Sequence, residues 1–249
     1  MIKSMNKPMS DDFYQWLESA SAVKYLNQEK KGFEKLFNEL SGQMGIQLSL
    51  NGQVDYLSQF NLSSQYLLYQ KQSEIVRQEG VNNMVVAGLD DLPFKNNQFS
   101  VVVAPRLTLL SNDSHSALRE IYRVTANEGY LAISGINPVS LIGFQSQVLP
   151  KYYPLLPSVG LRQMKVWLSL LGFNIIAGNM FHYSAMSNQA DYPVLSKKIE
   201  KIGTRWLPIF AGGYWLLAKK QIFGRHIIGS KKAKRLKTGK IASSVAKRY

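Results

Sequence analysis

The stretch from Phe99 to Ile136 constrains the fold of this chain more than any other. Phe99 to Ala104 reads FSVVVA, a β-branched run typical of a strand that is covered on both faces. From Ser114 to Thr125 the apolar residues recur at helical spacing, with Asp113 or Ser114 as the candidate N-cap. Tyr130 to Ile136 (YLAISGI) is a second apolar strand. Strand, helix and strand in close succession predict a βαβ unit and hence a parallel α/β sheet.

The flanking segments extend this alternation of helices and strands. Amphipathic spacing predicts one or two helices between Asp11 and Leu40. A helix is also expected over Leu161 to Leu171, whereas Ser140 to Pro157 shows no clear period. Five further strands are expected, over Gly45–Leu50, Gln65–Gln70, Asn83–Ala87, Phe173–Ala177 and Gly213–Lys219.

Composition excludes several classes of chemistry. The 249-residue chain has no cysteine and three widely separated histidines, which excludes thiol nucleophiles and argues against a zinc or iron centre. It also lacks a Walker-type phosphate loop, a G-x-S-x-G elbow and an H-E-x-x-H metal motif. The absence of cysteine and of an apolar run of roughly 20 residues predicts a soluble, cytoplasmic protein without a transmembrane segment.

The excess positive charge is concentrated at one end of the chain. Residues 1–200 carry 17 Lys or Arg against 16 Asp or Glu, whereas residues 201–249 carry 13 Lys or Arg and no acid. Sparse apolar residues after position 220 predict a basic, flexible tail over residues 221–249. Such a tail suits the phosphates of nucleic acid or an anionic membrane, and a solvated tail without a partner is an equally good interpretation. The basic residues that would make these contacts include Lys231, Lys232, Lys234, Arg235, Lys237 and Lys240.

Residues 90–143 carry a series of motifs that resembles a known family. The motifs DDLPF at 90–94, LREIYRV at 118–124 and NEGYLAISG at 127–135 follow the order and spacing of class I S-adenosylmethionine-dependent methyltransferases. SGINPVSLIG at 134–143 and the basic tail are similar to one proteobacterial branch of the methyltransferase type 11-like proteins. The resemblance implies a Rossmann-like, doubly wound α/β sheet, mostly parallel with one antiparallel strand near the C-terminus. It implies one domain over residues 1–220 that begins with a helical lead at 11–42.

The resemblance also implies a site for S-adenosylmethionine outside the carboxyl ends of the strands. Three segments would form it: Leu50, Asn51 and Gly52 after the first strand; Gly88, Asp90, Asp91 and Leu92 after the third; Pro105 and Arg106 after the fourth. No residue is singled out as catalytic, because methyl transfer mainly requires in-line positioning of the acceptor and the sulfonium methyl group.

The chain departs from the family pattern at three positions of this site. Gly52 stands alone where the family has a glycine-rich turn, Gln70 and Lys71 follow the second strand instead of an acid, and Gly88 replaces the usual Asp. Each lost hydrogen bond to a charged group would cost about 1.5 to 3 kcal/mol. Two functions are therefore open. One is a methyltransferase that acts on a small molecule entering over Ser140 to Pro157, and the other is an inactive module of this fold whose basic tail contacts nucleic acid or an anionic membrane.

Several of these residues also have a simpler structural interpretation. Asn51-Gly52 is a common turn sequence, Asp90-Asp91 can cap a turn, and Arg106 can be solvated at the rim of the site. We expect Tyr122 and Arg123 to pack against and solvate their helix. His115 and His182 are expected to be surface or hydrogen-bonded histidines rather than bases. The acceptor and the oligomeric state are not specified by the sequence.

Overall fold

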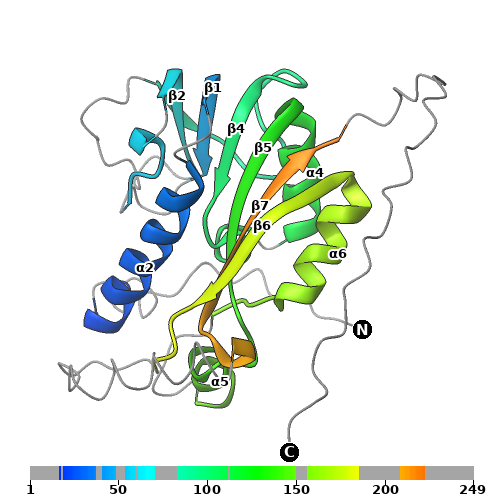
Figure 1. Ribbon diagram of the computed structural model, residues 1–249. Coiled ribbons are helices and arrows are strands. Elements are labelled where there is room, and N and C mark those ends of the chain that lie inside the picture. Colours follow the sequence, from blue (N-terminus) through cyan, green and yellow to red (C-terminus); the bar gives the residue numbers. More distant parts are fainter. Residues whose placement is uncertain are drawn as a thin grey trace, which may run out of the picture.

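A seven-stranded sheet forms the centre of the computed structural model, which describes residues 17, 19–37, 41–48, 54–59, 61–70, 83–111, 113–149, 156–184 and 208–221. The strand order is β3-β2-β1-β4-β5-β7-β6 (Figure 1). β7 pairs antiparallel with both of its neighbours, and the other pairs are parallel. This confirms the predicted sheet with one antiparallel strand near the C-terminus. The strands are β1 (Ser41–Leu48), β2 (Asn61–Tyr69), β3 (Asn83–Val86), β4 (Phe99–Ala104), β5 (Thr125–Ile136), β6 (Phe173–Phe181) and β7 (Gly213–Lys220).

Helices pack on both faces of this sheet. α2 (Ala20–Phe37) lies on one face, and α4 (Ser114–Val124) and α6 (Leu161–Leu171) lie on the other (Figure 1). The side chains of β4 alternate accordingly: Val101 and Val103 pack with Phe33 of α2, whereas Val102 belongs to the cluster that contains the apolar face of α4. A strand that is covered on both faces needs the apolar run that the sequence shows. Shorter helical elements are η1 (Leu57–Gln59), α3 (Leu107–Leu110), α5 (Leu141–Val148) and η3 (Pro208–Phe210).

In the described parts of the chain, the helices lack the combination of length and apolar character that a membrane crossing requires.

The predicted boundaries hold best in the middle of the chain. β4 has the predicted limits, and α4 begins at Ser114 because the Asp113 carboxylate accepts hydrogen bonds from two backbone N–H groups of the first turn. β5 starts at Thr125 rather than Tyr130. Residues 126–129 bulge between the pairs Phe99–Thr125 and Val101–Tyr130, with Glu128 at φ 60°, so the turn signal marks an irregularity inside the strand.

Two helices were not predicted from the sequence, and two strands start earlier than expected. α3 follows β4 where a loop was expected, and α5 lies inside the segment that showed no period. α5 has apolar residues on its buried side and on its solvent side, which removes the amphipathic signal. β1 and β2 each begin four residues before the predicted start.

The DDLPF motif at 90–94 and the LREIYRV motif at 118–124 contact each other in the fold. The Glu120 carboxylate accepts a hydrogen bond from the backbone N–H of Leu92 at 2.9 Å. Arg123 donates to the carbonyl oxygens of Leu92 and Phe94 at 2.8 and 2.7 Å, and it pairs with Glu120 at 2.7 Å. Glu120 and Arg123 therefore hold the turn that leads into β4. As expected, Arg123 has a structural role.

Candidate active site at the carboxyl edge of the sheet

At the carboxyl edge of the sheet, Gln47 of β1 contacts the segment that follows this strand. The predicted residues Leu50, Asn51 and Gly52 lie outside the described residues. On either side of them, the buried Gln47 side chain donates to the Val54 carbonyl at 2.7 Å and accepts from the Tyr56 N–H at 2.9 Å. Gln47 thus fixes where the chain returns after β1, at the position where the family carries its glycine turn.

The ends of β2 and β3 carry the second group of predicted residues. Gln70, directly after β2, donates a hydrogen bond from its side-chain amide to the Leu110 carbonyl at the end of α3. After β3, Gly88, Asp90 and Asp91 are exposed and Leu92 is buried. A Cβ atom at Gly88 would lie 2.7 Å from Oδ1 of Asp90, so this carboxylate lies over the glycine. The exposed acids at this edge are thus near the end of β3 rather than directly after β2.

A buried polar network lies after β4. Arg106 forms an ion pair with Glu29 of α2, and the two residues are 2% and 0% exposed. The Glu29 carboxylate also accepts hydrogen bonds from the hydroxyl groups of Tyr56 and Ser134, each at 2.5 Å. Ser134, on β5, in turn accepts from the backbone N–H of Arg106 at 2.7 Å. Arg106 is therefore not solvated at the rim, which corrects that interpretation: Glu29 compensates the guanidinium after it leaves water. Pro105 is buried beside it.

Backbone geometry and electrostatics both show how strongly this network is constrained. Arg106 has φ 50° and ψ 46°, a left-handed conformation that costs a non-glycine residue about 1–3 kcal/mol and persists only where the surrounding structure imposes it. Burial lowers the pKa of Arg106, but Glu29 and Tyr56 raise it more, so the net pKa lies above the usual range. Burial and the Glu29 carboxylate raise the pKa of the Tyr56 hydroxyl. Arg106 is therefore a cation and Tyr56 a neutral donor at every physiological pH.

The network fits a ligand with hydrogen-bond acceptors. Nε of Arg106 is buried and has no hydrogen-bond partner among the described residues. A buried donor without an acceptor costs about 1–3 kcal/mol, which an oxygen atom of a bound molecule would recover. The paired charges of Glu29 and Arg106 cancel, so the network does not repel a cationic sulfonium. The described residues at this edge are thus compatible with S-adenosylmethionine.

Sequence reasoning missed Glu29, Tyr56 and Ser134. Glu29 follows Leu26 by three residues and precedes Phe33 by four, which places it on the buried face of α2. An acid at a core position of a helix is the signal that could have identified it. Tyr56 and Ser134 carry no comparable local signal.

The histidines and Tyr122 have structural contacts. Nδ1 of the buried His182 lies 2.8 Å from the side-chain oxygen of Gln28 on α2. The ring of His115 packs against the tilted ring of Trp167 with a centroid distance of 4.0 Å. The ring of Tyr122 contacts Phe173 and lies 4.1 Å from Nζ of Lys220. These contacts agree with the structural interpretation of all three residues.

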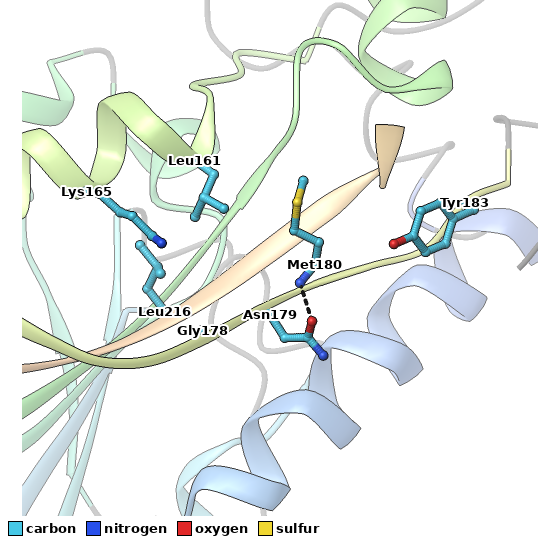
Figure 2. Close-up of a pocket in the computed structure, with 7 residues that line it drawn as sticks. All are labelled: Leu161, Lys165, Gly178, Asn179, Met180, Tyr183 and Leu216. Atoms are coloured by element: carbon cyan, nitrogen blue, oxygen red, sulfur yellow. Dashed lines mark hydrogen bonds between the residues drawn. The ribbon is translucent and has the colours of Figure 1, made fainter. Parts of the chain in front are cut away.

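A cavity of about 410 Å³ lies elsewhere, between α6 and β6 (Figure 2). Figure 2 shows Lys165 and the Tyr183 hydroxyl directed toward it from opposite sides. β6 is three places from β4 in the sheet, a separation of about 14 Å at the usual strand spacing. The cavity therefore lies apart from Arg106 and the polar network after β4.

The predicted tail contacts cannot be placed. Lys231, Lys232, Lys234, Arg235, Lys237 and Lys240 lie outside the described residues, so contact with nucleic acid or an anionic surface through them stays a prediction.

Comparison with known proteins agrees with this fold. Residues 48–133 match a family model described as a methyltransferase domain. The chain is 34% identical over 111 residues to the uncharacterized protein YafS of Escherichia coli, a match that covers 43% of this chain and 46% of that protein. The aligned region thus spans less than half of the length of this curated relative.

Solved structures share the architecture at low sequence identity. A SAM-dependent methyltransferase from Thermotoga maritima aligns with a TM-score of 0.59 at 16% identity, over 85% of this chain and 95% of that one. One from Archaeoglobus fulgidus aligns with a TM-score of 0.56 at 16% identity, over 85% and 100%. The [4+2]-cyclase SpnF aligns with a TM-score of 0.55 at 15% identity, over 82% and 83%. At such identities the likeness establishes the fold alone. Together with the match of residues 48–133 to the family model, it shows that this chain has the Rossmann-like α/β fold seen in S-adenosylmethionine-dependent methyltransferases.

Proposed function

We propose that this protein transfers a methyl group from S-adenosylmethionine to a small-molecule acceptor at the carboxyl edge of β1, β4 and β5. The observation that carries the proposal is the Glu29–Arg106 network. It occupies the position after β4 at which ligands lie in this fold, and it presents a buried Nε–H without a partner among the described residues. Bound there, the cofactor would supply an electrophilic methyl group on a sulfonium.

The chain's own residues would orient the reactants. Through its Nε–H group, Arg106 would donate a hydrogen bond to an oxygen atom of the bound molecule. Glu29 would keep the guanidinium in place and neutralise its charge. The exposed carboxylates of Asp90 and Asp91 would accept hydrogen bonds from hydroxyl or amino groups of the adenosyl portion. Positioning of this kind is the main requirement of methyl transfer.

One observation favours a second candidate function, an inactive module of the same fold. The Gln70 amide after β2 donates to the Leu110 carbonyl, at the position where the family resemblance implies an acid for the ribose. The loss of that contact weakens cofactor binding, and the fold itself does not require methyl transfer, since a [4+2]-cyclase shares it.

Calorimetric titration of the full-length protein with S-adenosylmethionine and S-adenosylhomocysteine separates the two candidates. Saturable heat at micromolar ligand supports the methyltransferase, and no heat at millimolar ligand would favour the inactive module. The double variant Asp90→Asn/Asp91→Asn should weaken binding about tenfold or more, because it removes at least one charge-assisted hydrogen bond.

A control that removes a single negative charge elsewhere accompanies this experiment. Glu128 is an exposed acid near the amino-terminal start of β5, away from the candidate site, and it forms an ion pair with the partly exposed Lys219. Glu128→Gln removes one negative charge and should leave the affinity within about twofold. Equal weakening by both variants would show a general charge effect and would refute the assigned role of Asp90 and Asp91.

A further inference from the structure

An exposed apolar surface lies at the carboxyl end of β5, around α5. Large apolar side chains are normally withdrawn from water, yet seven here are each 39–66% exposed. We call them the α5 surface: Val139, Leu141, Phe144, Val148, Leu149, Ile209 and Phe210.

These residues form one surface because α5 and η3 are tied together. The side-chain amide of the buried Asn137 donates to the carbonyl oxygens of Ile209 and Ala211 at 2.7 and 2.9 Å. Figure 1 shows the two elements next to each other at one end of the sheet. The Ser140 hydroxyl caps α5 by accepting from the Gly143 N–H at 3.0 Å. The surface is therefore presented by an anchored element.

α5 differs from an ordinary surface helix because it exposes an apolar face. Leu141, Phe144 and Val148 follow one another at spacings of three and four residues, so they share a face, and that face is the exposed one. The buried side includes Ser146, whose hydroxyl accepts from the Leu156 N–H at 2.5 Å. α5 contains no charged residue. Folding of this chain alone therefore does not explain why these side chains are apolar.

The part of the sequence that contains the α5 surface is strongly basic. Residues 129–249 contain 18 Lys or Arg and two acids, whereas residues 1–128 contain 12 Lys or Arg and 14 acids. No acid occurs between Glu128 and Asp191, the stretch that includes α5. The nearby first turns of α6 add the exposed cations Arg162 and Lys165. These features favour a binding partner that has both an apolar interior and a negatively charged surface.

We infer that the α5 surface docks onto an anionic lipid bilayer. Five of its seven side chains are aliphatic and fit between acyl chains, whereas binding of single-stranded nucleic acid would call for aromatic platforms. The basic half of the chain supplies the attraction to the negative headgroups. None of the seven residues belongs to the predicted cofactor site, although four lie in the segment 140–157 over which an acceptor is expected to enter, and the inference does not depend on methyl transfer.

Flotation of the full-length protein with lipid vesicles tests this. Vesicles of about one third phosphatidylglycerol in phosphatidylcholine should bind the protein, and pure phosphatidylcholine should bind it at least tenfold more weakly. Leu141→Ser/Phe144→Ser should lower binding to the anionic vesicles at least tenfold. Leu170→Ser, which changes an 81% exposed leucine of α6 outside the surface, should bind like the wild type.

A second readout does not depend on the stability of the serine variant. Tryptophan introduced by Phe144→Trp should be quenched by brominated phospholipids, and tryptophan introduced by Leu170→Trp should not, beyond the quenching of the wild type. Unchanged binding of the folded serine variant, equal quenching at both positions, or binding to single-stranded RNA without binding to vesicles would each overturn the inference. None of these measurements involves S-adenosylmethionine, so the proposed function can fail independently.

Discussion

The Glu29–Arg106 pair allows a double-mutant cycle with a large expected coupling. Either Glu29→Leu or Arg106→Leu leaves the partner charged, buried and unpaired. Breaking a buried ion pair in this way typically costs about 3–5 kcal/mol. The structure supports the upper part of that range, because the Glu29 carboxylate accepts hydrogen bonds from three groups: Arg106, Tyr56 and Ser134. At about 1.5–3 kcal/mol each, the three hydrogen bonds set an upper bound on the loss of stability, and relaxation of the variant structure will make the measured loss smaller.

The double variant Glu29→Leu/Arg106→Leu removes both charges, and its loss should be smaller than the sum of the two single losses by about 3 kcal/mol or more. Urea unfolding followed by tryptophan fluorescence suits this measurement, because Trp215 packs against Gly32 of α2. Denaturant slopes should agree among the four proteins, so that the midpoints report stability. Additive losses, to within about 0.5 kcal/mol, or single losses below about 1 kcal/mol would refute a buried, coupled network.

Three further predictions concern stability. Lys220→Met should lower the free energy of unfolding by about 2–4 kcal/mol in urea titrations, because Nζ donates to three oxygen atoms at 2.7–2.8 Å. Lys219→Met removes a partly exposed ion pair and should lower the same free energy by less than about 1 kcal/mol, so equal losses would contradict this prediction. The hydrogen bond from Arg123 lowers the pKa of Glu120 below its ordinary value of 4.5, so the stabilisation by this carboxylate is complete above that pH and is lost as the pH falls. The melting temperatures of the wild type and of Glu120→Gln should therefore differ less at about pH 3.5 than at about pH 6.5. A difference that stays constant would contradict this role of the Glu120 carboxylate. Asn137→Ala removes two buried hydrogen bonds and should cost about 1–3 kcal/mol in thermal unfolding, with proteolysis accelerated near α5; an unchanged digestion pattern would argue against this anchor.

Prediction from the sequence succeeded where the signal is local. The valines of β4 and the periodic face of α4 gave the correct elements and limits, because a strand covered on both faces and a helix covered on one impose distinct apolar periods. The same reasoning failed for α5, whose exposed face is as apolar as its buried one, and for the start of β5, where a bulge resembles a turn. Of the predicted site, Gly88, Asp90, Asp91, Leu92, Pro105 and Arg106 are placed near the ends of β3 and β4, and their contact with a cofactor remains a prediction.

The sequence by itself determined the order of the seven strands and of α2, α4 and α6, the excluded chemistries and the concentration of basic charge toward the C-terminal end. Only the tertiary structure decided that Arg106 meets Glu29, 77 residues earlier, and that the buried Lys220 donates to the carbonyl oxygens of Tyr122 and Thr125 at the α4–β5 junction. The reason is that periodicity reports which face of an element is buried, whereas a buried charge requires one particular partner that the chain brings to it from a distant segment.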